Sequence, residues 1–149
     1  MHTRSINYLL YSIFQQRADY YFMIRVAIAD DHPELRLALR LLLHLSKEIT
    51  VVCESGNGQE AVDCVKQLQP DVLVIDIQMP VLNGLDATRQ IVELSLPTRV
   101  IVISINREHF FARQAAVSGA KGFVSKDDIP RFLLPAIEAV YRGELFFRD

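Results

Sequence analysis

The 149-residue sequence predicts an α/β fold in which a parallel sheet is covered by helices on both faces. From residue 23 onward, short runs of Val, Ile and Leu alternate with segments whose apolar residues recur every three or four positions. The run VLVI at 72–75 contains no polar residue, which is typical of a central strand buried on both faces. Gly, Pro and Asn separate these segments. Because crossovers between parallel strands are right-handed, a doubly wound sheet is the expected arrangement.

Five segments rich in β-branched and apolar residues are predicted to be strands. They cover residues 24–30, 49–55, 71–76 and 99–104, and the shorter stretch KGFVSK that reaches Lys126. We find no internal repeat, low-complexity tract or linker within this alternation, so it indicates one domain.

Five helices are predicted between and after the strands. Pro33 suits the first turn of the first helix, whose apolar stripe is made of leucines. Asn57, followed three residues later by Glu60, resembles a capping pair that opens the second helix, which runs through Leu68. The remaining helices are expected at residues 85–94, 107–118 and 129–142.

The composition is that of an ordinary globular protein, with half of the residues hydrophobic and a formal net charge of −2. No basic excess indicates nucleic-acid binding, and no apolar run has the length needed to span a bilayer. Cys53 and Cys64 fall on a predicted strand and a predicted helix, where we expect two buried thiols. The absence of a CxxC pair and of a nearby histidine argues against a zinc site.

The first 22 residues do not fit the alternation. Their apolar residues follow helical spacing and predict a short amphipathic helix: Ile6, Leu9, Leu10, Ile13 and Phe14. Met23 directly precedes a strand pattern, so we expect it to be the natural start and residues 1–22 to be a mis-assigned extension. Residues 144–149 are expected to form a C-terminal tail.

Polar residues occur where the predicted strands end: Asp30 and Asp31 after the first, Asp76 at the third, Ser104 at the fourth and Lys126 at the fifth. The carboxyl ends of parallel strands meet at one edge of the sheet, where open α/β sheets bind ligands. Carboxylates brought together there raise one another's pKa unless a cation is present, and Mg²⁺ prefers such oxygen ligands. One carboxylate could then act as a nucleophile toward a phosphoryl group, with the lysine and the serine contacting its oxygens.

The segments VAIADDHP, VLVIDIQMPVLNG, VIVIS and GAKGFVSK, in this order and at these spacings, resemble the receiver domain of two-component response regulators. The resemblance runs from about Met23 to Gly143. It implies a flavodoxin-like fold, with a five-stranded sheet of order 2-1-3-4-5 and five helices. The details ADDHP, GAKGF and YRGELFF are similar to the LuxR-type subclass, whose members usually continue into a helix-turn-helix domain.

By this resemblance, Asp76 is the phosphoacceptor that attacks a phosphohistidine of a sensor histidine kinase. Asp30, Asp31 and Asp76 would hold Mg²⁺, together with the backbone carbonyl of Gln78. Such a chain is a signalling phosphoacceptor rather than an enzyme, with at most magnesium-dependent self-phosphorylation and autodephosphorylation.

The resemblance also implies a conformational switch. Ser104 would supply the switch hydroxyl, Lys126 would contact the phosphate, and Phe123 would be the aromatic residue that changes rotamer. The response would control transcription through a missing or separate output domain. A longer form would be expected to bind DNA, although this chain is not expected to do so directly.

The resemblance further implies a cytoplasmic protein without a membrane association. The apolar tail of the last helix is a candidate surface for homodimerisation. Two possibilities remain open for the chain, a stand-alone receiver and a fragment of a longer regulator.

Two residues depart from the family pattern. Ile105 stands after the switch serine, where a small residue is common, and its bulk is expected to narrow access to the phosphate. Pro135 lies inside the last predicted helix, where a proline removes a backbone hydrogen bond, so we expect a kink or a later helix start.

Two alternative functions compete with this interpretation. GNGQEA at 56–61 fits the dinucleotide-binding pattern G-x-G-x-x-A, with Asp76 about twenty residues further on. That pattern would lie on the second strand and would leave the other strand-end residues unexplained. A pseudo-receiver that binds partners without being phosphorylated is the second alternative.

Overall fold

The computed structural model describes residues 23–106 and 109–148. All strands of this part lie in one parallel sheet of order β2-β1-β3-β4-β5-β6. The strands are β1 (Ile24–Ala29), β2 (Ile49–Ser55), β3 (Val72–Asp76), β4 (Arg99–Ser104), β5 (Gly122–Ser125) and β6 (Phe146–Phe147). Our predictions for residues 1–22 lie outside the described residues.

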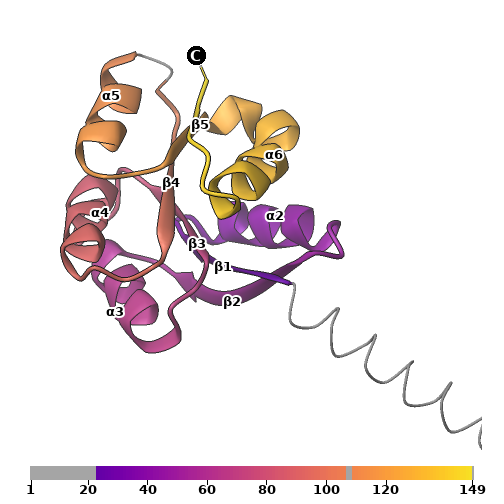
Figure 1. The fold of residues 1–149 in the computed structure, drawn as a ribbon, viewed down its shortest axis with the longest axis horizontal. Coiled ribbons are helices and arrows are strands. Elements are labelled where there is room, and N and C mark those ends of the chain that lie inside the picture. The colour runs from indigo at the N-terminus through magenta and orange to yellow at the C-terminus, as the bar shows by residue number, and fades with distance from the viewer. Residues whose placement is uncertain (1–22, 107–108, 149) are drawn as a thin grey trace, which may run out of the picture.

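Helices cover both faces of this sheet (Figure 1). They are α2 (Pro33–His44), α3 (Gly58–Leu68), α4 (Gly84–Glu93), α5 (His109–Val117) and α6 (Ile129–Tyr141), with a short 3₁₀ helix η1 (Lys126–Asp128) before the last. Figure 1 shows α2 and α6 on one side of the strands and α3, α4 and α5 on the other. Within the described residues, no helix is long and apolar enough to cross a membrane.

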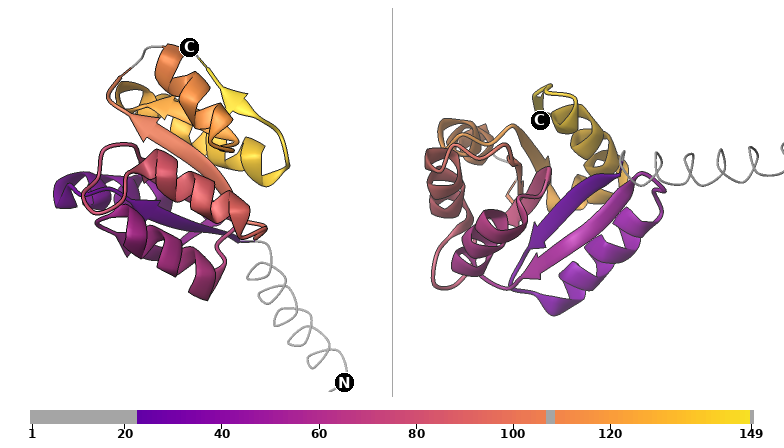
Figure 2. Two further views of the ribbon diagram at one scale, coloured as in Figure 1. Left: turned by 90° about the vertical axis from the view of Figure 1, so that its left-hand side faces the viewer. Right: turned by 60° about the horizontal axis from the view of Figure 1, so that its bottom comes forward.

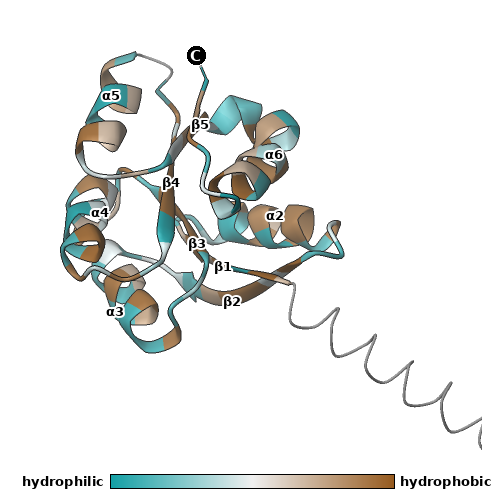
Figure 3. Cartoon of the chain, viewed as in Figure 1, coloured by the Kyte–Doolittle hydropathy of each residue, from teal (hydrophilic) through white to brown (hydrophobic). Residues whose placement is uncertain are grey.

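Each face of the sheet has its own hydrophobic core. The core under α2 and α6 contains alternate residues of the central strands, among them Val72, Val74 and Ile101. The core under α3, α4 and α5 contains their neighbours Leu73, Ile75 and Val100. β3 is therefore buried on both faces, as its apolar run predicted, and Figure 3 shows the hydrophobic colour gathered on these strands.

The prediction of five strands in the order 2-1-3-4-5 is correct for β1 to β5, but the sheet has a sixth strand. β6 pairs in parallel with β5 at the edge of the sheet, within the segment that we predicted to be a tail. Figure 2 shows this last strand as a yellow arrow near the C-terminus. Because β6 has only two residues, no run of β-forming residues signals it in the sequence.

The predicted start of the second helix is confirmed, and a side chain caps it there. Asn57 Oδ1 accepts a hydrogen bond from the Glu60 amide at 2.9 Å, as the capping pair predicted. The last helix begins at Ile129 and runs through Pro135, so the later start that we considered is wrong. Pro130 lies in the first turn of this helix, where the missing amide has no intrahelical partner to lose.

The cysteines lie on β2 and α3 as predicted, and both are free thiols. Cys64 is buried, but Cys53 is only half-buried, so the expectation of two buried thiols is only partly correct. Burial, followed by the neighbouring Cys53, raises the pKa of the Cys64 thiol to about 12. This thiol is therefore neutral at physiological pH.

Candidate functional site

The residues that end β1, β3, β4 and β5 meet at one edge of the sheet, as the parallel topology predicted. They surround a pocket of about 260 Å³. Its lining consists of Asp31, His32, Asp76, Gln78, Ser104, Ile105 and Lys126. Every candidate site residue therefore lines this pocket, apart from Asp30 and Phe123.

Lys126 links two buried carboxylates at the floor of this site. Its ammonium lies 2.9 Å from Oδ2 of Asp30 and 3.3 Å from Oδ2 of Asp76. Both carboxylates are buried, Asp30 completely. Buried carboxylates are stable in their charged form only with such partners, so one cation here balances two acids.

Asp31 and His32 lie beside these two carboxylates and are more exposed to solvent than they are. His32 Nδ1 lies 2.9 Å from Oδ1 of Asp30 and 3.1 Å from Oδ1 of Asp31. The His32 amide also donates to Asp30 Oδ1 at 2.8 Å. Nδ1 can donate its hydrogen to only one carboxylate, and Asp31 Oδ1 is left buried without a hydrogen-bond donor.

The environment shifts the pKa values of three groups in the site. Burial, and then the charge of Asp30, raise the pKa of Asp76, while Lys126 opposes this shift. Burial lowers the pKa of Lys126, but its hydrogen bond to Asp30 and the charge of Asp76 outweigh burial, so the net pKa is raised. The hydrogen bond to Asp30, followed by the charge of Asp31, raises the pKa of His32.

Ser104 ends β4 and is buried beside the pocket. Its hydroxyl oxygen accepts a hydrogen bond from the Asn106 amide at 3.1 Å, while its backbone is paired with Ser125 of β5. Phe123 lies two residues before Ser125 on β5 and is only 3% exposed. Its ring is therefore buried in the core under α5 and does not line the pocket.

The loop after β3 holds Asp76 in place through a close backbone contact. A Cβ atom on Gly84 would lie 1.9 Å from the carbonyl oxygen of Asp76, so only glycine allows this approach. The Gly84 amide donates to Ile77 at 2.8 Å, and its carbonyl accepts from the hydroxyl of buried Thr88 at 2.7 Å. The first turn of α4 is thereby fixed against the end of β3.

His32 is a residue of the site that the sequence analysis does not single out. Its side chain is 63% exposed, and its Nδ1 lies against two carboxylates. Its position between Asp31 and Pro33 was the available signal, since a residue directly after an acidic pair is held close to it by the chain. Ile105 lines the pocket, as its position after Ser104 predicted, and its side chain is largely exposed.

The dinucleotide-binding alternative meets a specific obstacle at Gly58. Its amide, which would face a pyrophosphate, donates to the carbonyl of Leu82 at 3.1 Å. A Cβ atom on Gly58 would lie 2.1 Å from that same oxygen. The glycine pattern therefore serves the contact of α3 with the loop before α4.

The acidic cluster has the chemistry of a divalent-cation site. One ligand atom from each of Asp30, Asp31, His32 and Asp76 lies within 4.8 Å of the others. The carboxylate oxygens suit a hard cation such as Mg²⁺, and the unpartnered Asp31 oxygen faces this cluster without a donor. These residues therefore fit the ion.

Comparison with known proteins gives a family for this fold and site. Residues 26–138 match the response regulator receiver domain. The chain is 34% identical over 125 residues to the transcriptional regulatory protein YxjL of Bacillus subtilis, and 34% identical over 124 residues to the nitrate/nitrite response regulator protein NarL of Escherichia coli K12. These alignments cover 84% and 83% of this chain and 57% of each relative, so the chain spans little more than half the length of these relatives.

Solved structures agree with this assignment. The signal receiver domain of the response regulator NarL from Mycobacterium tuberculosis superposes with a TM-score of 0.79 at 34% identity, covering 82% of this chain and 98% of that one. A LuxR-family two-component response regulator from Aurantimonas gives a TM-score of 0.80 at 31% identity, covering 83% and 89%. The chain belongs to the receiver-domain family of two-component response regulators, and to its LuxR-type members.

Proposed function

We propose that this chain accepts a phosphoryl group on Asp76 from a sensor histidine kinase and changes conformation in response. The observation that carries the proposal is the position of Asp76 at the end of β3, with the Lys126 ammonium 3.3 Å from its carboxylate. A nucleophilic carboxylate next to a cation is what transfer of a negatively charged phosphoryl group requires.

Asp30, Asp31, Asp76 and the backbone carbonyl of Gln78 would hold Mg²⁺ in this proposal. When bound, the ion supplies positive charge that offsets the phosphoryl oxygens. Its ligands are supported by the protein itself, because Arg36 donates to the Asp30 carbonyl at 2.6 Å and Lys126 donates to the Asp30 carboxylate. These contacts hold the cluster in place before the ion binds.

In the transfer step, a carboxylate oxygen of Asp76 attacks the phosphorus of a phosphohistidine. The new O–P bond forms as the N–P bond breaks, and the imidazole leaves with the electron pair. Lys126 would turn from Asp30 to a phosphoryl oxygen, where its charge neutralises part of the nearly two negative charges carried by the phosphorylated side chain. The reaction needs Asp76 ionised, and Lys126 favours that form against burial.

The proposed conformational change would begin at the hydroxyl of Ser104. Its oxygen accepts a hydrogen bond from the Asn106 amide, which leaves its O–H available to donate to a phosphoryl oxygen on Asp76. This new hydrogen bond and the movement of Lys126 would pull the ends of β4 and β5 toward Asp76. Phe123, on β5, is our candidate for the aromatic residue that responds.

We place the receiver domain at residues 23–143, with residues 144–149 as a tail that contains β6. Response regulators of this type act with sensor histidine kinases and bind DNA through an output domain. Control of transcription through such a domain, homodimerisation and a cytoplasmic location are part of this proposal. The protein would act as a signalling phosphoacceptor whose site also resets by hydrolysing its own acyl phosphate.

Labelling with radioactive acetyl phosphate and Mg²⁺ tests the proposal. Wild type should acquire a label that hydroxylamine removes, as expected for an acyl phosphate, and Asp76→Asn should acquire none. Asp63→Asn, which changes a carboxylate on the exposed face of α3, should label like wild type. Absence of label in the wild type would favour the pseudo-receiver alternative, and NAD binding would revive the dinucleotide alternative.

A further inference from the structure

The short strand β6 pairs with β5 over only two residues. Phe146 lies opposite Gly122 and Phe147 opposite Phe123. The Phe146 amide donates to the carbonyl of Lys121 at 2.9 Å. A strand of two residues has few ladder hydrogen bonds, so its position depends on its side chains.

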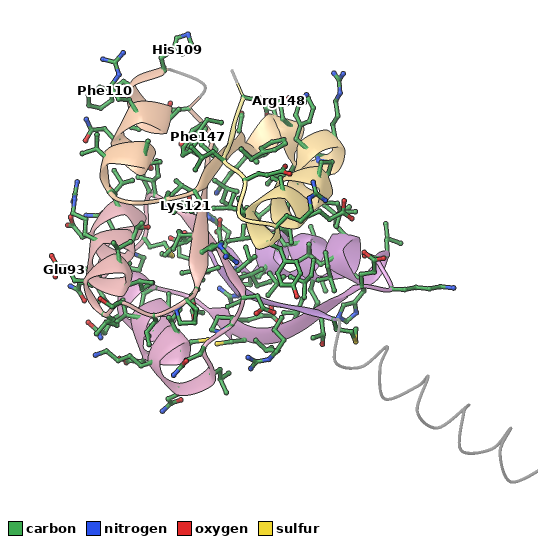
Figure 4. The ribbon with its side chains drawn as sticks, viewed as in Figure 1. Glu93, His109, Phe110, Lys121, Phe147 and Arg148 are labelled. Carbon is green, nitrogen blue, oxygen red and sulfur yellow. The ribbon has the colours of Figure 1, made fainter. Side chains whose placement is uncertain are left out.

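The two aromatic rings of β6 are partly buried and pack against different cores. Phe146 packs against the core under α2 and α6, with its ring centroid 6.3 Å from that of Phe132. Phe147 packs against the core under α5, which includes its paired neighbour Phe123. Figure 4 shows Phe147 on the α5 side of the final strand and Arg148 on the α6 side. The Arg148 guanidinium lies 5.2 Å from the Phe132 ring and 5.4 Å from the Phe146 ring.

The close approach of β6 to β5 depends on the glycine at position 122. A Cβ atom there would lie 3.2 Å from the carbonyl oxygen of Phe146 and 3.3 Å from Cγ1 of Ile101. Gly143, with φ +89°, makes the turn that leads from α6 to the strand. Gly122 and Gly143 therefore allow the segment after α6 to turn back and pack against β5.

β5 joins this tail to the phosphorylation site. Lys126 follows β5 directly and contacts Asp30 and Asp76, while Phe123 on the same strand contacts the core that receives Phe147. A small shift of β5 will break the pairing with a two-residue neighbour more readily than the longer pairing with β4.

We propose that β6 is a docked strand whose release is coupled to phosphorylation of Asp76. This inference rests on the proposed function of the site. When Lys126 moves from Asp30 to a phosphoryl oxygen, the end of β5 moves with it, and Phe147 loses its fit against Phe123. Release of β6 uncovers Phe123 and the outer edge of β5.

Hydrogen exchange of the full chain tests this coupling. The probe is beryllofluoride, formed from beryllium chloride and sodium fluoride in the presence of Mg²⁺, as a stand-in for the phosphoryl group on Asp76. We expect the Phe146 amide to exchange at least about fivefold faster with the probe than without it, the lower limit of ordinary coupling between two sites. Unchanged or slower exchange would overturn the inference.

A reciprocal measurement uses variants of the tail. Because coupling is mutual, Phe147→Ala should bind beryllofluoride at least about fivefold more tightly than wild type, as followed by fluorine NMR. Leu145→Ala is the matched control, since this side chain is 66% exposed and lies just before the strand. Equal affinity of Phe147→Ala and wild type would contradict the coupling.

Acetyl phosphate labelling separates this inference from the proposed function. If Asp76 is labelled but exchange of the tail does not change, the proposed function stands and the role of β6 is wrong. If Asp76 is not labelled, the proposed function fails, and with it the coupling.

Discussion

The ammonium of Lys126 lies 2.9 Å from the carboxylate of Asp30, a residue 96 positions earlier in the chain. Asp30 is completely buried and Lys126 nearly so, with 13% of its side chain exposed. The pair therefore joins the ends of β1 and β5 across the site. A phosphoryl group on Asp76 would compete with Asp30 for the same ammonium.

Removal of the Lys126 charge should destabilise the protein and separate phosphorylation from its response. Lys126→Ala leaves the buried Asp30 without its cation, so the free energy of unfolding should fall by about 3 kcal/mol in EDTA, the ordinary cost of breaking a buried pair. Mg²⁺ should restore part of this loss by binding the carboxylates. Urea unfolding in EDTA and in Mg²⁺ measures both, with Lys126→Arg as the charge-retaining control. Equal stability of Lys126→Ala and wild type in EDTA would contradict this role.

Asp76→Asn should stabilise the metal-free protein at neutral pH. Burial and Asp30 raise the pKa of Asp76 above its unfolded value, so the ionised carboxylate weakens the fold at a pH above the folded pKa. The gain from Asp76→Asn should shrink as pH falls through the raised folded pKa and vanish well below the unfolded pKa of about 3.9, where the carboxyl is protonated in both states. Thermal unfolding in EDTA across this pH range checks the sign. A variant less stable than wild type at pH 7 would show that the pair with Lys126 outweighs burial.

Gly84→Ala should damage both the fold and the site. The added Cβ would meet the backbone of Asp76 at 1.9 Å, and this backbone cannot move without displacing β3 or α4. We expect a loss of at least about 3 kcal/mol in the free energy of unfolding, the upper end of overpacking costs, and reduced labelling of Asp76. Gly56→Ala is the matched control, because its Cβ would meet only the ends of two side chains, Arg36 at 3.5 Å and Glu60 at 3.9 Å. Similar losses in the two variants would contradict the argument.

The meeting of the strand-end residues could be predicted from the sequence because it follows from the topology of a parallel sheet. Five strands were recognisable as apolar runs, and parallel strands bring their carboxyl ends together whatever the loops do. The sequence alone therefore places Asp30, Asp76 and Lys126 at one edge of the sheet. The sequence does not predict which carboxylate Lys126 contacts more closely. Its ammonium lies 2.9 Å from Asp30 and 3.3 Å from Asp76, and the difference depends on side-chain packing.

The features that escaped sequence reasoning depend on short or strained backbone segments. β6 has two residues and is held by contacts to distant parts of the chain, so no local pattern shows it. The contact of His32 with Asp30 depends on the loop that follows β1. Val81 has a φ of +70°, a conformation that a β-branched residue rarely adopts and that its sequence does not suggest.

Val81→Gly should stabilise the protein. Val81 is 81% exposed, so its side chain contributes little packing, while its left-handed backbone is strained. Glycine adopts this conformation freely, and we expect a net gain of about 1 kcal/mol after allowance for its greater freedom in the unfolded chain. Urea unfolding measures the gain. Val81→Ala, which removes the branched side chain but keeps a Cβ, should gain less; a loss of stability in Val81→Gly would disprove the strain.

Binding of Mg²⁺ should lower the pKa of His32. In the structure the hydrogen bond to Asp30, and then the charge of Asp31, raise this pKa above 6.5. A cation on these carboxylates removes the acceptor and adds positive charge next to the ring, and both effects favour the neutral imidazole. NMR titration of the ring in EDTA and in Mg²⁺ measures the change, with His32→Gln used to assign the signal.

By linkage, protons on His32 should compete with the metal. The affinity for Mg²⁺ should fall as pH decreases through the raised pKa of His32, and it should fall less steeply in His32→Gln. His44 on α2, which the pocket lining does not include, supplies the control variant His44→Gln, whose pH dependence should match wild type. If Mg²⁺ leaves the His32 titration unchanged, the ion does not displace the imidazole, and the carboxylates beside it are not its ligands.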